Sequence, residues 1–155
     1  MVRSAAVIWS HEFVVRAPVD AIYRYALSPE HWFTFFPGYA GLVGVEGEWP
    51  QPGSAISVRY RLVGPWTIVL RQEVVAHDRG RLLELDERAL GDLWIDHPRF
   101  EFAERPDGTT EVTLTVRPES RYRWARPIIW LVSQPFRWVT PRAMRRLAAQ
   151  VEASR

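Results

Sequence analysis

The chain has 155 residues, of which 47% are hydrophobic and 25% charged, a balance typical of one globular domain rather than a disordered segment. A chain of this length buries roughly 70% of the surface that it exposes when unfolded, which leaves room for a core and a cavity. There is no cysteine, and all 20 basic residues are arginine. Disulfides, thiolate metal sites, a cysteine nucleophile and a Schiff-base or P-loop lysine are therefore excluded, and the lack of cysteine fits a reducing cytoplasm.

The net charge of +2 is unevenly distributed along the chain. Residues 1–116 carry 11 arginines against 16 acidic residues, whereas residues 117–155 carry nine arginines against two. The acidic body argues against nucleic acid as a partner, and the basic end leaves an anionic ligand or a membrane open. We expect no signal peptide, because Met1–Trp9 lacks a long apolar stretch and a cleavage site, and no membrane span, because the longest apolar run is residues 127–132.

The N-terminal part of the chain predicts one strand followed by two short helices. Residues 11–17 alternate between apolar and polar side chains, as a half-buried strand does. Pro18 then begins a helix, and Pro29 suits the first turn of a second one. This second helix carries four aromatic residues before Pro37-Gly38 ends it.

Six segments with a period of two follow. Turn sequences such as Pro106-Asp107-Gly108 separate them. In each segment one set of alternate side chains is mainly apolar and the other mainly polar, which is typical of an antiparallel sheet covered on one face. The predicted strands span residues 42–48, 54–63, 66–76, 81–89, 93–104 and 109–117.

Residues 124–152 return to a helical period, with an apolar stripe from Ile128 to Val151 and arginines off the stripe. Pro135 and Pro141 lie inside this segment, and each should kink or break the helix. We therefore expect two or three helical pieces, with Thr140 as a capping residue of the last one.

Three stretches carry a resemblance to a known family: HEFVVRAPVDAIYRYALSPEHWFTFFPG, GLVGVEGEWPQPGSAISVRY and WVTPRAMRRLAAQVEA. With the order of elements, they resemble the START/birch-pollen-allergen (SRPBCC) superfamily of helix-grip proteins, in its bacterial polyketide cyclase/dehydrase branch. The resemblance covers nearly the whole chain and implies a single α+β domain over residues 1–155. It implies a seven-stranded antiparallel sheet curled around a long C-terminal helix, with a deep cavity between them for an apolar or amphipathic small molecule. It implies no universal catalytic motif.

Polar residues in the inward phase of the strands are candidate catalytic groups. Glu87 and Asp96 share this phase with apolar neighbours, and a carboxyl group in an apolar cavity has a raised pKa suited to general acid or base work near neutrality. Tyr60 can stabilise a carbonyl oxygen by a hydrogen bond. The alternative is that both carboxylates lie near strand ends, solvated or paired with Arg88 or Arg99, and that Tyr60 packs in the core. A bulge at Pro98 would also turn Asp96 to the other face.

Large aromatic residues and one amide are candidates for ligand binding, unless the rings simply fill the core. So many rings suit a flat polycyclic or a long apolar ligand. No metal or other cofactor is expected, because the four histidines form no pair at ligand spacing and no glycine-rich phosphate loop is present. The candidates are Tyr25, Trp32, Phe36, Trp66, Gln72, Trp94, Phe100, Phe102, Trp130 and Phe136.

Three functions remain open at this point. The first is binding of a hydrophobic small molecule, the second a cofactor-independent cyclase, aromatase or dehydratase for a polyketide-like substrate, and the third a membrane-associated lipid carrier. The third would use the arginine-rich helix around Arg137, Arg142, Arg145 and Arg146 to meet anionic lipid, and the same segment also suits an acyl carrier protein. The alternative for this helix is a solvated outer face, and both a monomer and a dimer are compatible with the sequence.

Overall fold

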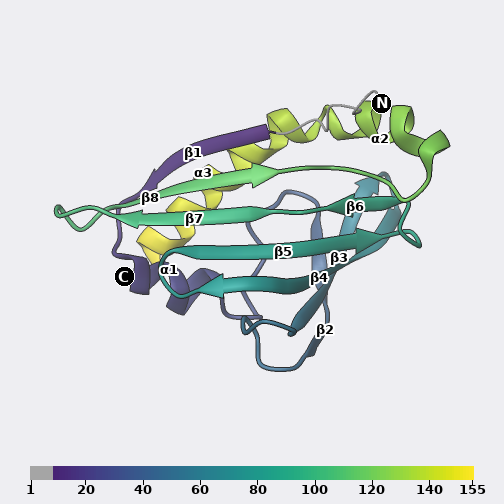
Figure 1. Ribbon diagram of the computed structural model, residues 1–155. Coiled ribbons are helices and arrows are strands. Elements are labelled where there is room, and N and C mark those ends of the chain that lie inside the picture. The colour runs from purple at the N-terminus through teal and green to yellow at the C-terminus, as the bar shows by residue number, and fades with distance from the viewer. Residues whose placement is uncertain (1–8) are drawn as a thin grey trace, which may run out of the picture.

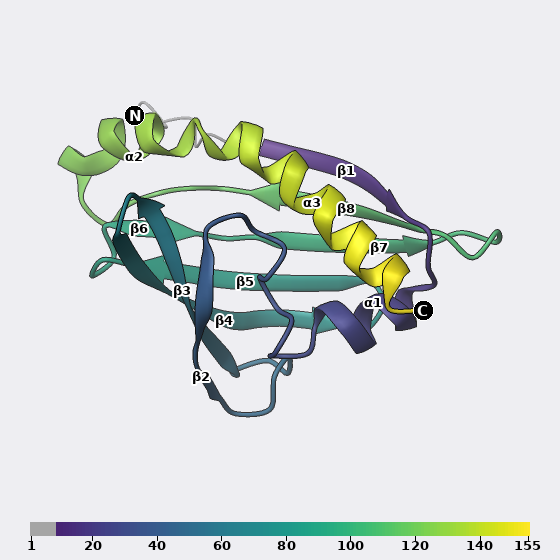
Figure 2. The same ribbon diagram turned by 180° about the vertical axis from the view of Figure 1, so that it is seen from behind.

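A computed structural model describes residues 9–155 of the protein. The expectation that no signal peptide is present concerns Met1–Trp9, most of which lies outside these residues. A curled antiparallel sheet carries the long helix α3 across one face (Figures 1 and 2). In chain order the elements are β1 (Trp9–Val15), α1 (Val19–Ala26), β2 (Tyr39–Glu46), β3 (Ala55–Val63), β4 (Trp66–Asp78), β5 (Leu82–Ala89), β6 (Trp94–Asp96), β7 (Arg99–Glu104), β8 (Thr110–Val116), the 3-10 turn η1 (Arg123–Ala125), α2 (Arg126–Ser133) and α3 (Phe136–Ala153).

The sheet has the order β1-β8-β7-β5-β4-β3-β2, and the short strand β6 also pairs with β5. All of these pairs are antiparallel. The expected helix-grip architecture is confirmed, with eight strands within residues 9–155 instead of seven. The additional strand arises at Pro98, which has no N–H to donate and separates β6 from β7 within the predicted strand 93–104.

The prediction of a second short helix after α1 is wrong. Residues 28–38 form successive turns, closed by hydrogen bonds such as those from the His31 N–H to the Ser28 carbonyl and from the Phe36 N–H to the Phe33 carbonyl, both 3.0 Å long. Phe33 has a φ of 68°, which a helix does not allow. Turns permit the burial of Trp32 beside Phe33, whereas one face of a helix does not present two adjacent side chains equally.

The C-terminal helical segment follows the prediction at one proline and departs from it at the other. Pro135 separates α2 from α3, as expected. Pro141, however, lies inside α3. The carbonyl that it leaves without an N–H partner belongs to Arg137 in the first turns of the helix. Because Arg137 is exposed, water can satisfy this carbonyl and the helix continues. Thr140 is therefore a buried residue within α3 and not the cap of a separate helix.

The space between the sheet and the helices is filled at one end and hollow at the other. Beside α1, the second half of α3 buries Met144, Leu147 and Val151 against sheet residues that include Leu83. Helix α2 lies beyond the opposite end of the sheet from α1 (Figure 1). The hollow end is bounded by α2 and by the first turns of α3.

Candidate ligand-binding cavity

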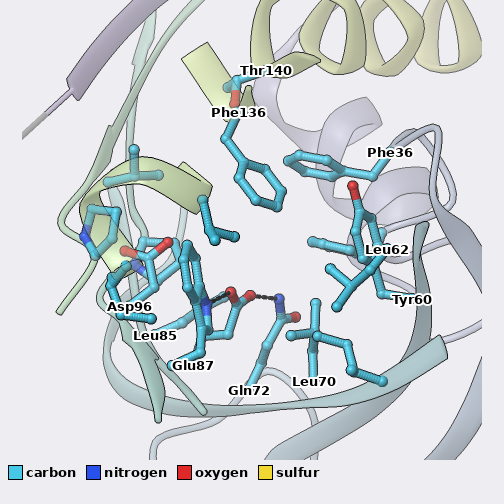
Figure 3. Close-up of a pocket in the computed structure, with 18 of the residues that line it drawn as sticks. Phe36, Tyr60, Leu62, Leu70, Gln72, Leu85, Glu87, Asp96, Phe136 and Thr140 are labelled. Atoms are coloured by element: carbon cyan, nitrogen blue, oxygen red, sulfur yellow. Dashed lines mark hydrogen bonds between the residues drawn. The ribbon is translucent and has the colours of Figure 1, made fainter. Parts of the chain in front are cut away.

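A cavity of about 250 Å³ lies between the inner face of the sheet, α2 and the start of α3. Figure 3 shows the lining side chains around an open centre, with Phe36 and Phe136 on one side and Leu70 and Leu85 on the side of the sheet. An apolar cavity of roughly 150 Å³ holds one benzene molecule. This cavity therefore has room for more than one ring or for a short aliphatic chain.

Most of the candidate site residues lie in the wall of this cavity. They come from the turns after α1, from β3, β4, β5, β6 and β7, and from α3, so residues distant in the sequence meet around one space. Their roles in binding or catalysis stay predictions. The candidates that line the cavity are Tyr60, Glu87, Asp96, Trp32, Phe36, Gln72, Trp94, Phe100 and Phe136.

Four candidates do not line the cavity, and their assignment is corrected. Trp66 is 75% exposed because it begins β4 beside a register shift that ends the inward alternation. Trp130 is 52% exposed because α2 turns Ile129 inward instead. Tyr25 stacks on a neighbouring histidine ring 4.1 Å away, and Phe102 belongs to the filled core.

The sequence interpretation missed Trp9 and the aliphatic part of the wall. Trp9 alternates with Phe13 and Val15, but the predicted strand began two residues too late to include it. Trp9 is buried, lines the cavity, and its indole N–H has no hydrogen-bond partner among the residues that the structure describes. The missed aliphatic residues share the inward phase of the predicted strands, and they include Leu62, Ile68, Leu70, Leu85, Leu114 and Val116.

Glu87 is the centre of a hydrogen-bond chain on the floor of the cavity (Figure 3). Its two carboxylate oxygens accept hydrogen bonds from the Gln72 amide and from the Trp94 indole, the latter 3.2 Å long. The Gln72 oxygen accepts in turn from the Trp32 indole at 2.6 Å. All donors in this chain of hydrogen bonds point toward Glu87. An ionised Glu87 carboxylate, which only accepts hydrogen bonds, therefore satisfies them best.

Asp96 lies directly opposite Glu87 across the β5–β6 pair. Its Oδ1 accepts the backbone N–H groups of His97 and Arg117, both at 2.8 Å, and no described residue donates to Oδ2. Burial, followed by the nearby Glu87 carboxylate, raises the pKa of Asp96 to about 8. Burial also raises the pKa of Glu87, against the opposing effect of its hydrogen bonds to Gln72 and Trp94.

The charge of Glu87 raises the pKa of Asp96, so one proton on the pair avoids two buried like charges. The hydrogen bonds place this proton on Asp96. Both Glu87 oxygens already accept a hydrogen bond, so a proton on either of them would point at another donor. Oδ2 of Asp96 receives no hydrogen bond from a described residue and can carry the proton. At neutral pH the cavity thus presents one acid and one base side by side.

Tyr60 lies on β3, which β4 separates from β5, and its hydroxyl has no hydrogen-bond partner among the described residues. Burial raises the pKa of Tyr60, and the negative charge of Glu87 raises it further. The hydroxyl therefore stays protonated at neutral pH and can donate to an oxygen of a ligand.

The alternative of solvated or arginine-paired carboxylates is wrong for both residues. Glu87 and Asp96 are each 6% exposed. Arg88 pairs instead with Asp86 and Asp92, and Arg99 pairs with two glutamates on the outer face of the sheet.

Residues 9–155 hold no group of three or more His, Asp or Glu side chains placed to share a metal ion. Within the same range, no helix combines the length and the apolar character needed to cross a bilayer.

The curled sheet, the long helix against it and the cavity between them define a helix-grip protein. The chain belongs to the family described as polyketide cyclase / dehydrase and lipid transport, whose model matches residues 7–152. The resemblance seen in the sequence is thereby confirmed. A search among curated proteins finds no match to this chain.

Solved structures of low sequence identity share the fold. The Zhui aromatase/cyclase from Streptomyces sp. R1128 is 13% identical, with a TM-score of 0.69 over 94% of this chain and 93% of that one. Ara h 8.0201 is 13% identical, with a TM-score of 0.72 over 96% and 99%. The ginseng major latex-like protein 151 from Panax ginseng is 15% identical, with a TM-score of 0.65 over 93% and 96%.

Proposed function

We propose that this protein binds a hydrophobic small molecule in the cavity between the sheet and the helices. The observation that carries the proposal is an apolar cavity of about 250 Å³ whose polar groups are confined to a few positions. Ligand sites of this kind combine apolar walls with a small number of polar groups that fix orientation. Here those groups are the Glu87–Asp96 pair and Tyr60.

The same geometry indicates the chemistry of the ligand. The lining rings of Trp94, Phe136 and Phe36 favour a flat aromatic or polyunsaturated body, because rings stack or meet edge to face. A carbonyl or hydroxyl oxygen on that body can accept hydrogen bonds from protonated Asp96 and from Tyr60. The volume favours two or three rings, and a longer ligand would extend through the open end of the cavity.

Filling the cavity from its wall should abolish ligand binding. Ile68 lines the cavity and is only partly buried, so Ile68→Trp places the added ring in the ligand space at little cost to the core. We expect the affinity for the fluorescent probe N-phenyl-1-naphthylamine to fall by at least about tenfold, which corresponds to 1.4 kcal/mol. Val69 follows on the outer face of the same strand and is exposed, so Val69→Trp is the matched control and should bind like the wild type. Equal affinity in all three proteins would contradict the proposal.

The buried acid and base favour a second candidate function, a cofactor-independent cyclisation or dehydration of a poly-β-ketone. The Glu87 carboxylate would remove a proton from the carbon between two carbonyl groups, and the resulting enolate carbon would bond to a second carbonyl carbon. Asp96 would deliver its proton to the oxygen of that carbonyl, so no oxidant or reductant is needed. The fold is shared with an aromatase/cyclase, which is consistent with this candidate.

A further inference from the structure

The cavity opens at the end of the molecule where α2 lies. Leu62, Leu90, Ile128 and Val132 all line the cavity and are nevertheless 42 to 55% exposed. We take these four exposed lining residues to mark its mouth. They come from β3, from the β5–β6 loop and from α2, which meet at this end of the sheet (Figures 1 and 2).

Large apolar side chains also project outward from the elements that border the mouth. They are between 65 and 75% exposed, more than any other large apolar side chain that the structure describes. Large exposed apolar side chains gathered at one end of a molecule are typical of an interaction site. We call these residues the mouth band: Val63, Trp66, Trp124, Leu131 and Trp138.

The surroundings of the mouth band are positively charged. Five exposed arginines lie on the same or adjoining segments, and none forms an ion pair with any residue that the structure describes. The acidic residues at this end, Asp92 and Glu119, are already bonded to Arg88 and His97. The free cations are Arg61, Arg121, Arg123, Arg126 and Arg137.

We propose that the mouth band docks on an anionic bilayer, so that the cavity opens toward the membrane and takes its ligand from the lipid phase. This inference rests on the proposed function and adds the source of the ligand to it. Tryptophan is the side chain most suited to the membrane–water interface, and basic residues beside it are attracted to anionic headgroups. A second copy of the chain fits the band less well, because a symmetric contact would bring the arginines of both copies together.

Co-sedimentation with vesicles tests the charge complementarity. The wild type should bind vesicles of phosphatidylglycerol mixed with phosphatidylcholine at low salt, lose this binding as salt increases, and not bind pure phosphatidylcholine. The triple variant R121Q/R123Q/R126Q should bind on the order of 100-fold more weakly, because each surface arginine contributes about 1 kcal/mol. The control R16Q/R24Q/R81Q removes the same charge from exposed arginines within α1, directly after β1 and directly before β5, and should bind like the wild type.

The apolar part of the band is tested by Val63→Asp, which should lower vesicle affinity by at least about tenfold. Its control is Val75→Asp, at an exposed valine toward the far end of β4, and this variant should bind normally. Probe binding in the absence of vesicles should be unchanged in all of these variants. A wild type that binds the probe but no anionic vesicle would overturn the docking proposal while the proposed function stands, and the band would then suit an acidic carrier protein. Equal weakening by variants and controls would also overturn it.

Discussion

The Asp96→Asn protein should be more stable than the wild type at pH 8, and the two should converge near pH 4. The folded pKa of Asp96, about 8, lies above the value of about 3.9 for an unfolded chain. Between these pH values the folded state binds a proton that the unfolded state has lost, so the stability of the wild type falls as pH rises. The expected slope is about 1.4 kcal/mol per pH unit across this window.

Asparagine suits the site because its oxygen can accept the two backbone N–H groups and its amide replaces the O–H of the protonated acid. Chemical unfolding from pH 4 to 9 measures the difference. Asp86→Asn is the matched control, since Asp86 lies on β5 beside Glu87 and is bonded to Arg88 on the outer face. A wild type whose stability is constant from pH 5 to 8 would contradict the assignment of the proton to Asp96.

The same variant separates the two candidate functions. An asparagine at position 96 cannot deliver a proton, so a cyclising enzyme should lose at least about 100-fold in turnover of a poly-β-ketone thioester, the usual contribution of a general acid. The affinity of this variant for N-phenyl-1-naphthylamine should stay within about threefold of the wild type. Retention of turnover by Asp96→Asn would remove Asp96 as the acid and leave binding as the function of the cavity.

Glu87→Gln should act in the opposite direction and destabilise the protein by about 1–3 kcal/mol. Glutamine at this position sets an amide N–H against either the Gln72 amide or the Trp94 indole, both of which are donors. One buried donor then lacks an acceptor, and leaving such a group unpaired usually costs about 1–3 kcal/mol of stability. The free energy of unfolding at pH 7 measures the loss.

A second substitution can restore the chain of hydrogen bonds. Gln72 and Glu87 are direct partners across β4 and β5, so the exchanged protein Q72E/E87Q still has an acceptor for every donor. The carboxylate introduced on β4 would accept from Trp32 and from the amide introduced on β5, and the oxygen of that amide would accept from Trp94. We expect the double variant to recover most of the lost stability. Losses that simply add in the double-mutant cycle would contradict the hydrogen-bond chain.

The strands were predictable because their side chains alternate, and this alternation also placed Glu87, Gln72 and Tyr60 on the inner face. Alternation carries no information on where a strand loses its partner. For this reason the inward phase was extended to Trp66, beyond the register shift between β3 and β4. The turns after α1 are predicted as a helix because their closely spaced aromatic residues resemble the apolar face of a helix. The positive φ of Phe33, which interrupts a helix there, leaves no signal in the sequence.

The polar part of the site was only half predictable. The sequence indicated two inward carboxyl groups, but it did not show that Glu87 and Asp96 are direct partners across β5 and β6. That pairing follows from the register of the sheet, because β6 continues on the other side of Pro98 the register in which β7 pairs with β5. Alternation within each strand does not fix this register. The mouth band could not be predicted from the sequence either, because it combines the β3–β4 turn with helices that lie about 60 residues further along the chain.

A crystal structure of the protein with N-phenyl-1-naphthylamine tests the central claim most directly. We predict one molecule in the cavity, with its rings against Phe36, Trp94 and Phe136 and its N–H toward the Glu87–Asp96 pair. A probe found only on the outer surface, with the cavity between the sheet and α3 unoccupied, would contradict the account.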